Sequence, residues 1–282
     1  MTTTPQHLTR PEGRVAYTVT GSGPLVVTAP GMGDLGDVYR DVVPALVAAG
    51  YRVASTDLRG HGASDTTFTT HGVRETAGDL LALVEDLGSP AVLVGHSMSA
   101  DSAAWAAIQG GDLVAGVVLI SPHLQAPPAG RLARLQVSAL LRRPWGAAAW
   151  AAFYRSLHPG RRAPWFDEHL TAIRTALRDP GRMSSFGALA RSLIAGHPHL
   201  PLDEVTVPTL VLHGELDPEL KDPAAELELA TSLLVAADVT TRLVPESGHY
   251  PHSQRPDVVV PALLDLLSVV ARRSSAWNRA GA

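Results

Sequence analysis

A serine flanked by small residues, directly after a buried strand, constrains the fold of this chain more than any other feature. The apolar run at residues 91–94 ends at Gly95, Ser97 follows two positions later, and a helix-compatible stretch begins at Met98. This order is typical of a strand, a sharp turn and a helix, with the serine at the apex. Strand and helix nearly touch at such a turn, so small residues are required on either side of the serine. Gly95 and Ser99 meet that requirement.

Short apolar strands alternate with amphipathic helices along most of the chain. Apolar runs predict strands at residues 14–20, 25–29, 52–56, 91–95, 114–121, 205–213 and 239–244. Helical spacing predicts helices at residues 39–47, 73–87, 224–236 and 256–271, and another after Ser97. Runs that are apolar at every position are typical of strands buried on both faces of a parallel sheet. We therefore predict an α/β fold, with a mostly parallel central sheet and helices on both faces.

The middle of the chain departs from this alternation. Between His123 and Leu200 the periodicity is helical only. This stretch contains 11 arginines and three acidic residues, a net charge of +8, whereas the whole chain has a net charge of −4. The same stretch holds half of the chain's 14 aromatic residues. It therefore differs in composition from the rest of the chain, which indicates a second structural unit. We predict a core at residues 1–122 and 202–282 and an inserted helical cap at 123–201, with a loose tail at 274–282.

The composition excludes several classes of site. A chain of 282 residues can bury a large core, and the absence of cysteine excludes disulfides, thiolate metal sites and cysteine nucleophiles. The first residues lack a basic segment followed by an apolar one, and no apolar run approaches the roughly 18 residues of a membrane helix. We expect a cytoplasmic protein that binds neither nucleic acid nor membrane.

A nucleophilic serine needs a base within hydrogen-bonding reach, and the base needs an acid to orient it. His249 follows the last predicted strand, and Gly248 gives the backbone freedom to present it, with His252 as the local competitor. Loops that follow parallel strands share one edge of the sheet, so His249 and Ser97 can meet there. His96, beside the serine, is expected to pack or to hydrogen-bond nearby.

The orienting acid and the oxyanion donors are expected at the same edge. Asp217 follows the strand at 205–213 and precedes a proline that fixes a turn, with Glu215 as the alternative acid. A tetrahedral intermediate needs N–H donors for its oxyanion. We predict the backbone N–H groups of Met98, at the start of the helix after Ser97, and of Met32, in the glycine-rich loop after the strand at 25–29.

Taken together, these segments resemble the α/β-hydrolase superfamily, in its capped serine esterase and haloperoxidase-like branch. The resemblance is carried by residues 29–33, 57–64, 95–99 and 247–256. Pro30 stands where relatives often have histidine, and Ser99 where glycine is commonest. The order Ser97, Asp217, His249 is the serine, acid, histidine order of this superfamily. The resemblance implies its fold, with the middle segment in the position of its cap.

The predicted function is that of a serine hydrolase that cleaves a small to medium carboxylic ester, thioester or lactone through an acyl-enzyme at Ser97, with no cofactor and no metal. One alternative keeps the fold for acyl transfer, C–C bond hydrolysis or lyase chemistry. Another is a ligand-binding or signalling homologue with little turnover. A third is a thioesterase that serves a carrier protein.

The cap supplies the candidates for substrate binding, and each has a structural alternative. Aromatic side chains that could line an apolar acyl site, or attach the cap to the core, are Trp145, Trp150, Phe153 and Tyr154. The arginines, first among them Arg142 and Arg143, could attract an anionic substrate or an acidic carrier protein, or cover solvent-facing helix surfaces. His197 and His199 are a weak indication of a metal. The expected partner is a small-molecule acyl substrate, bound by a monomer or homodimer.

Overall fold

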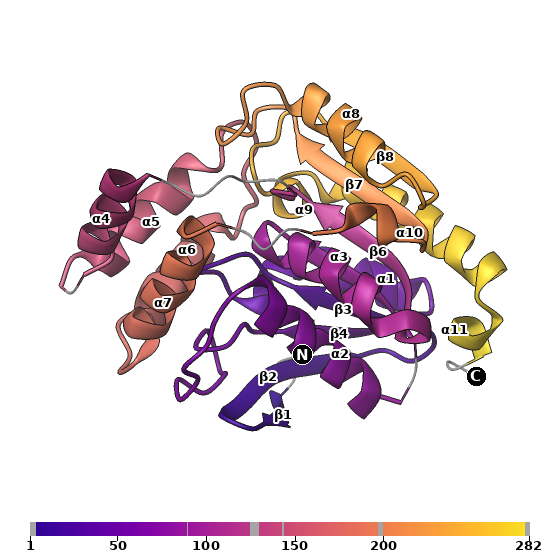
Figure 1. Cartoon of the computed structure of the whole chain (residues 1–282), viewed down its shortest axis with the longest axis horizontal. Helices are drawn as coiled ribbons and strands as arrows, with labels where there is room; N and C mark the ends of the chain where they lie inside the picture. The colour runs from indigo at the N-terminus through magenta and orange to yellow at the C-terminus, as the bar shows by residue number, and fades with distance from the viewer. Residues whose placement is uncertain (1–3, 89, 125–129, 143, 197–199, 280–282) are drawn as a thin grey trace.

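A single sheet forms the centre of the protein in the computed structural model, which describes residues 4–88, 90–124, 130–142, 144–196 and 200–279. Its strands are β1 (Gln6–Arg10), β2 (Gly13–Thr20), β3 (Leu25–Ala29), β4 (Arg52–Thr56), β5 (Ala91–His96), β6 (Val114–Ile120), β7 (Thr209–Gly214) and β8 (Val239–Val244). They lie in the order β1-β2-β4-β3-β5-β6-β7-β8 (Figure 1). Strand β2 is antiparallel to both neighbours, and the pairs from β4 to β8 are parallel. The predicted mostly parallel sheet is confirmed.

Helices cover both faces of this sheet. In the core they are η1 (Gly36–Tyr39), α1 (Val43–Ala48), α2 (Val73–Asp86), α3 (Met98–Gly110), η2 (Gly111–Leu113), η3 (Leu202–Glu204), α8 (Pro223–Leu233), α9 (Pro251–Gln254) and α10 (Pro256–Arg273). Successive strand residues point to opposite faces, so Val26 and Val92 pack in the apolar layer beneath α1 and α10. Val27 and Leu93 pack in the layer beneath α2, α3 and α8. This double burial explains why the central strands are apolar at every position.

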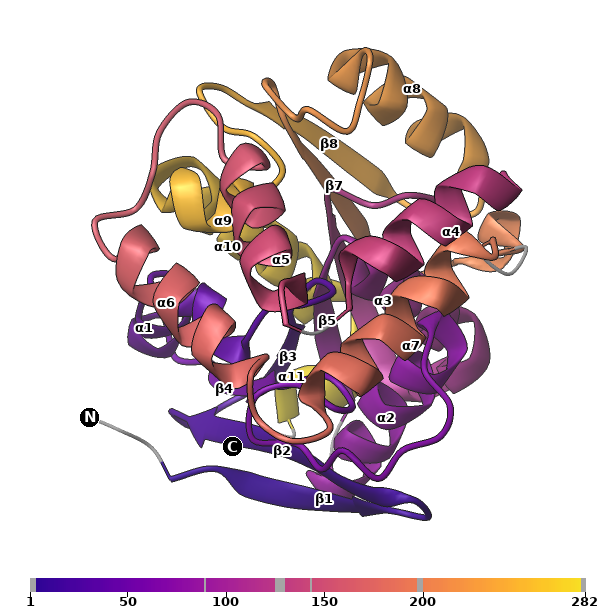
Figure 2. The same ribbon diagram turned by 90° about the vertical axis from the view of Figure 1, so that its left-hand side faces the viewer.

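Between β6 and β7, the regular elements of the described part of the inserted segment are helices. Its helices are α4 (Arg131–Leu140), α5 (Gly146–Ser156), α6 (Phe166–Ala176) and α7 (Arg182–Ile194). Figure 2 looks onto these four helices, with β3 and β5 behind them. Trp150, Tyr154 and Phe186 are buried in the same apolar layer as α1 and α10, so the aromatic residues attach the cap to the core.

Both ends of the chain form structure that the sequence pattern does not predict. Strand β1 is missed because Leu8 is the one residue of this edge strand that is buried. The expectation of a loose tail is wrong as far as residue 279, because α11 (Ser275–Arg279) docks on the core. The indole of Trp277 is fully buried and donates a hydrogen bond to the Leu25 carbonyl oxygen at 2.8 Å. One buried side chain in a short segment leaves no periodicity to detect.

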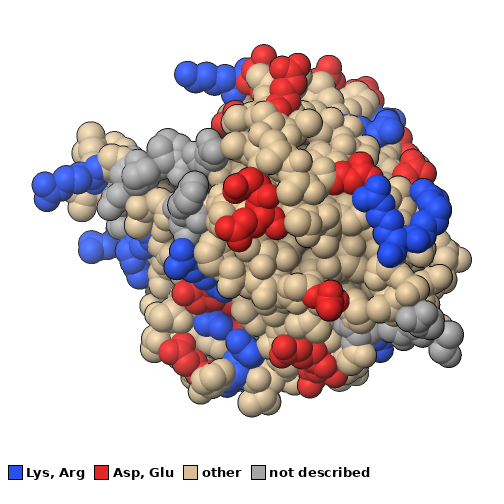
Figure 3. All heavy atoms as spheres, turned by 45° about the vertical axis from the view of Figure 1, so that its right-hand side comes forward, with Lys and Arg blue, Asp and Glu red and all other residues tan. Residues whose placement is uncertain are grey.

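The distribution of surface charge agrees with the compositional difference between cap and core. In Figure 3, basic side chains protrude at the left-hand edge, on the cap side of the molecule, while the face of the core carries scattered acidic side chains and a second basic group at the right. No helix among the described residues is long and apolar enough to cross a membrane. Most of the described arginines between residues 123 and 200 are exposed.

Candidate active site

The turn between β5 and α3 holds Ser97 in a conformation that few residues adopt. Its backbone has φ of 54° and ψ of −126°, a strained combination for a residue with a side chain. The Ser97 N–H donates to the Ile120 carbonyl oxygen at 2.8 Å, which ties the turn to β6. A Cβ atom on Gly95 would lie 2.0 Å from the carbonyl oxygen of Ser99, so only glycine fits there. The predicted strand, sharp turn and helix are present, with Ser97 half-buried at the apex.

Ser99, where glycine is commonest in the superfamily, makes a contact that glycine could not. Its hydroxyl is buried and donates a hydrogen bond to the Pro30 carbonyl oxygen at 2.6 Å. Pro30 begins the loop after β3, which carries the predicted oxyanion donor Met32. Ser99 therefore joins the turn at Ser97 directly to the loop that carries Met32.

Asp217 and His249 form a buried pair at the carboxyl edge of the sheet. His249, which follows β8, places its Nδ1 2.8 Å from Oδ2 of Asp217, which follows β7. Burial alone would raise the pKa of Asp217, but the hydrogen bond and charge interaction with His249 hold this pKa below its usual range. Glu215, the alternative acid, is exposed and accepts the N–H of Glu246 instead. The predicted contact between Asp217 and His249 is therefore present.

The other ring nitrogen of His249 faces a second acid, which the sequence analysis did not identify. Nε2 lies 3.2 Å from Oε2 of Glu219, and the same oxygen lies 3.3 Å from Nε2 of His123. Burial opposes a charged His123 ring, but its hydrogen bond and ion pair with Glu219 raise its pKa to about 8. Within the described part of the chain, Ser97 makes no hydrogen bond to His249. The structure thus brings Asp217 and His249 together and leaves Ser97 nearby, at the end of a parallel strand of the same edge.

His96 and His252, the other histidines near the turn, are packed into the core. Nε2 of His96 lies 2.8 Å from the carbonyl oxygen of His249, and the centroid of its ring lies 4.3 Å from that of the Tyr250 ring. His252 is fully buried against Tyr39, at 4.7 Å between ring centroids. Burial lowers the pKa of both histidines well below the usual value, so both rings are neutral at physiological pH.

The loop after β3, which carries Met32, lies directly against Ser97. A Cβ atom on Gly31 would lie 2.7 Å from Nδ1 of the buried His96 ring and 3.3 Å from Cβ of Ser97, so glycine lets the loop backbone approach this closely. The Gly33 N–H donates to Nε2 of His61 at 3.2 Å, while Nδ1 of that ring lies 2.8 Å from the Arg59 carbonyl oxygen. Burial lowers the pKa of His61 to about 4, so its ring is neutral and Nε2 can accept. Met98 opens α3, where the first backbone N–H groups of a helix have no partner within it.

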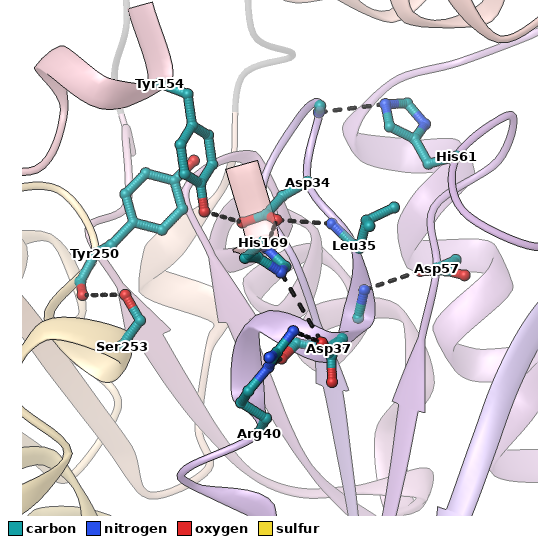
Figure 4. Close-up of polar contacts among 12 residues, drawn as sticks. Asp34, Leu35, Asp37, Arg40, Asp57, His61, Tyr154, His169, Tyr250 and Ser253 are labelled. Carbon is teal, nitrogen blue, oxygen red and sulfur yellow. Dashed lines mark hydrogen bonds and ion pairs between the residues drawn. The ribbon is translucent and has the colours of Figure 1, made fainter. Parts of the chain in front are cut away.

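The cap holds the same loop from the other side (Figure 4). The Trp150 indole donates to the Gly33 carbonyl oxygen at 2.9 Å, and the Tyr154 hydroxyl donates to Oδ2 of Asp34 at 3.1 Å. Nε2 of His169, from α6, lies 2.6 Å from Oδ1 of Asp34. All of these residues are buried. Sequence reasoning missed Asp34 and His169, because their contact depends on how the cap docks rather than on a local motif.

The remaining cap candidates lie elsewhere. Trp145 and Phe153 are 53% and 41% exposed, so in this structure they face solvent. Their assignment to substrate binding stays a prediction. Arg142 is exposed, and Arg143, His197 and His199 lie outside the described residues. Of the predicted aromatic set, Trp150 and Tyr154 directly contact the loop after β3.

The strained serine, the Asp217–His249 pair and the parallel sheet define this protein as an α/β hydrolase in architecture. A model of the alpha/beta hydrolase family matches residues 26–262, and the chain belongs to that family. Two relatives that align over most of the chain are named as a hydrolase and as an esterase, and the coarse function of the chain is that of a hydrolase.

Two relatives and one solved structure illustrate what the chain is similar to. It is 27% identical over 265 residues to the 2-(acetamidomethylene)succinate hydrolase of Mesorhizobium japonicum, an alignment that covers 90% of this chain and 92% of the relative. It is 30% identical over 259 residues to a protein of Oryza sativa subsp. japonica that is named as a "Probable esterase", over 86% and 91% of the two chains. The crystal structure of the enol-lactonase from Burkholderia xenovorans superposes with a TM-score of 0.75 at 20% identity, over 93% of this chain and all of the other. That likeness shows the shared fold.

Proposed function

We propose that this protein is a serine hydrolase that cleaves a small to medium carboxylic ester, thioester or lactone through an acyl-enzyme at Ser97. The observation that carries the proposal is the buried Asp217–His249 pair, 2.8 Å apart, at the sheet edge where the turn holds Ser97 strained and half-buried. A serine hydroxyl becomes an effective nucleophile when such an oriented base reaches it.

In the proposed mechanism, Ser97 Oγ attacks the substrate carbonyl while Nε2 of His249 takes its proton. The same nitrogen then protonates the leaving group and later activates the water that hydrolyses the acyl-enzyme. Asp217 accepts the Nδ1 hydrogen of His249, which keeps Nε2 free to act as a base. Before the first step Nε2 must turn from Glu219 to Ser97. Because the Glu219 side chain is 30% exposed, it can swing into solvent, and catalytic contacts often tighten only once substrate is bound.

The backbone N–H groups of Met32 and Met98 would bind the oxyanion of the tetrahedral intermediate. Preorganised donors stabilise developing charge because they need not reorient during the reaction. Hydrogen bonds at Pro30, Gly33 and Asp34 hold the Met32 loop on both sides, which supports that role. The cap, taken as residues 123–201, would exclude water from the acyl site.

The relatives support the substrate class. Names among them include an esterase and an enol-lactonase, and both ester and enol-lactone substrates present a carbonyl to a nucleophile. The acetamidomethylene succinate hydrolase extends the range of carbonyl compounds beyond simple esters. We therefore propose a screen over esters, thioesters and lactones of increasing acyl length.

A fluorophosphonate probe and short p-nitrophenyl esters test the proposal. We expect the wild-type protein to be labelled and to hydrolyse at least one ester, and Ser97→Ala to lose the label and about 10⁴-fold or more of kcat. Ser232→Ala, an exposed serine on α8, should match the wild type. Labelling that persists in Ser97→Ala, or turnover that the substitution leaves undiminished, would refute the mechanism. An unlabelled wild-type protein without turnover would favour a ligand-binding homologue.

A further inference from the structure

Three side chains with metal-binding atoms converge beside the proposed base. They are His123 from the loop after β6, Glu219 from the loop after β7 and His249 from the loop after β8. One nitrogen from each histidine and one oxygen of the carboxylate all lie within 4.8 Å of one another. The two histidine rings stack with centroids 5.5 Å apart. Three loops from neighbouring parallel strands therefore deliver one donor each to a single point.

The donor set and its spacing suit zinc. Two imidazole nitrogens and a glutamate oxygen are the protein ligands of a common class of zinc site, with bonds of about 2.0–2.1 Å to nitrogen. Neighbouring ligands of a tetrahedral ion with such bonds lie about 3.3 Å apart. Glu219 Oε2 lies 3.2 Å from His249 Nε2 and 3.3 Å from His123 Nε2, so two of the three separations already match.

The surroundings add two further properties of a built metal site. Asp217 accepts the Nδ1 hydrogen of His249 at 2.8 Å, an arrangement that orients a metal-bound histidine and makes its other nitrogen more basic. The side chains of His123 and Glu219 are 25% and 30% exposed, so an ion can reach them from solvent. Because nitrogen donors dominate the set, zinc should bind in preference to Mg²⁺ or Ca²⁺.

We propose that His123, Glu219 and His249 form a zinc site with its fourth position open to water. A bound ion occupies the lone pair on Nε2 of His249, which the proposed base needs for proton transfer. Zinc therefore inhibits hydrolysis reversibly. Binding itself depends only on the three ligands, whereas inhibition rests on the proposed function. The proposed site departs from the sequence-based expectation of no metal, which stays untested.

Binding is tested by calorimetric titration of tag-free protein with Zn²⁺, and by the visible spectrum of the Co²⁺-loaded protein. We expect one ion per chain, a four-coordinate cobalt spectrum and no response to Mg²⁺. His123→Ala and Glu219→Gln should each weaken binding by about tenfold or more. His7→Ala, an exposed histidine on β1 at the far end of the sheet, should bind as the wild type does. Absence of one-to-one binding, or equal affinity in both ligand variants and the wild type, overturns the site.

Inhibition is tested separately on ester hydrolysis. Activity should fall as Zn²⁺ saturates the protein and return with a chelator, and in His123→Ala the same fall should need about tenfold more metal. Ser97→Ala should bind zinc with unchanged affinity, since Ser97 is not a ligand. If that variant binds zinc while no protein shows Ser97-dependent hydrolysis, the metal site stands and the proposed function fails. Wild-type hydrolysis that saturating zinc leaves unchanged overturns the inhibitory role.

Discussion

Two buried aspartate–histidine pairs lie near the carboxyl edge of the sheet, and they differ in what the second nitrogen of the ring does. Asp217 lies 2.8 Å from Nδ1 of His249, and Asp34 lies 2.6 Å from Nε2 of His169. Each histidine is at most 2% exposed. Nε2 of His249 faces the partly exposed Glu219, whereas Nδ1 of His169 is buried and makes no hydrogen bond among the described residues. The Asp34 carboxylate also accepts hydrogen bonds from the Tyr154 hydroxyl and the Leu35 N–H.

The difference teaches that the position of the pair, rather than its composition, separates a chemical role from a structural one. Asp217 and His249 both come from core loops, and Nε2 of the His249 ring faces the Glu219 carboxylate, which is 30% exposed and therefore lies where solvent can reach. Asp34 and His169 join a core loop to a cap helix, and the carboxylate is saturated with hydrogen bonds (Figure 4). We therefore expect the first pair to govern turnover and the second to govern the attachment of the cap.

The largest effect is expected from Asp217→Asn. An asparagine keeps the shape of the side chain but removes the charge and allows the wrong tautomer of His249, so kcat should fall by about 10³- to 10⁴-fold. Steady-state kinetics on the best ester from the screen measures this. Glu215→Gln, two residues earlier on the exposed face of the same loop, is the matched control and should stay within about twofold of the wild type. A loss of less than tenfold in Asp217→Asn would remove Asp217 from the mechanism.

A smaller effect, and on a different quantity, is expected from Asp34→Ala. The substitution leaves His169 and Tyr154 buried without their partner, so the free energy of unfolding should fall by about 3 kcal/mol. Urea denaturation measures this loss. Asp37→Ala removes an exposed carboxylate that lies 3.9 Å from the other nitrogen of His169, and should cost about 0.5 kcal/mol or less. Equal stability of the two variants would mean that the second pair does not attach the cap.

The same comparison shows how far sequence reasoning reaches. The turn at Ser97 and the contact between Asp217 and His249 follow from strand ends that share one edge, which local patterns reveal. Their catalytic roles remain predictions. Sequence reasoning did not identify Glu219 and His169, because each contacts a partner on a distant loop or helix and the cap has helical periodicity but no sequence motif. The burial of Trp277 was not predicted for a related reason, because a single buried side chain produces no hydrophobic periodicity.

A third expected effect is a pH dependence of stability that arises from buried neutral histidines. Burial lowers the pKa of His158 to about 3 and of His213 to about 4, against 6.5 for the unfolded chain. The unfolded state therefore binds more protons than the folded state between about pH 6.5 and 4, so the free energy of unfolding falls as the pH is lowered through that range. Each pKa unit of difference corresponds to about 1.4 kcal/mol per histidine at most. Asp217 has a lowered pKa in the folded protein, so the stability it contributes is lost only as the pH falls below 3.8, its pKa in the unfolded chain. The loss of stability caused by the histidines begins at higher pH, which separates the two effects.

His158 makes this prediction specific to the cap. Its Nδ1 lies 2.8 Å from the Tyr154 carbonyl oxygen, and its ring stacks on Tyr250 at 4.3 Å. Replacing it by phenylalanine removes one titrating group while keeping an aromatic ring in place. The slope of unfolding free energy against pH between 6.5 and 4 should therefore decrease by an amount that corresponds to at most one bound proton. Urea denaturation at several pH values measures the slope, and His7→Phe on β1 is the exposed control that should leave it unchanged. An unaltered slope in His158→Phe would mean that this histidine does not contribute to the pH dependence of stability.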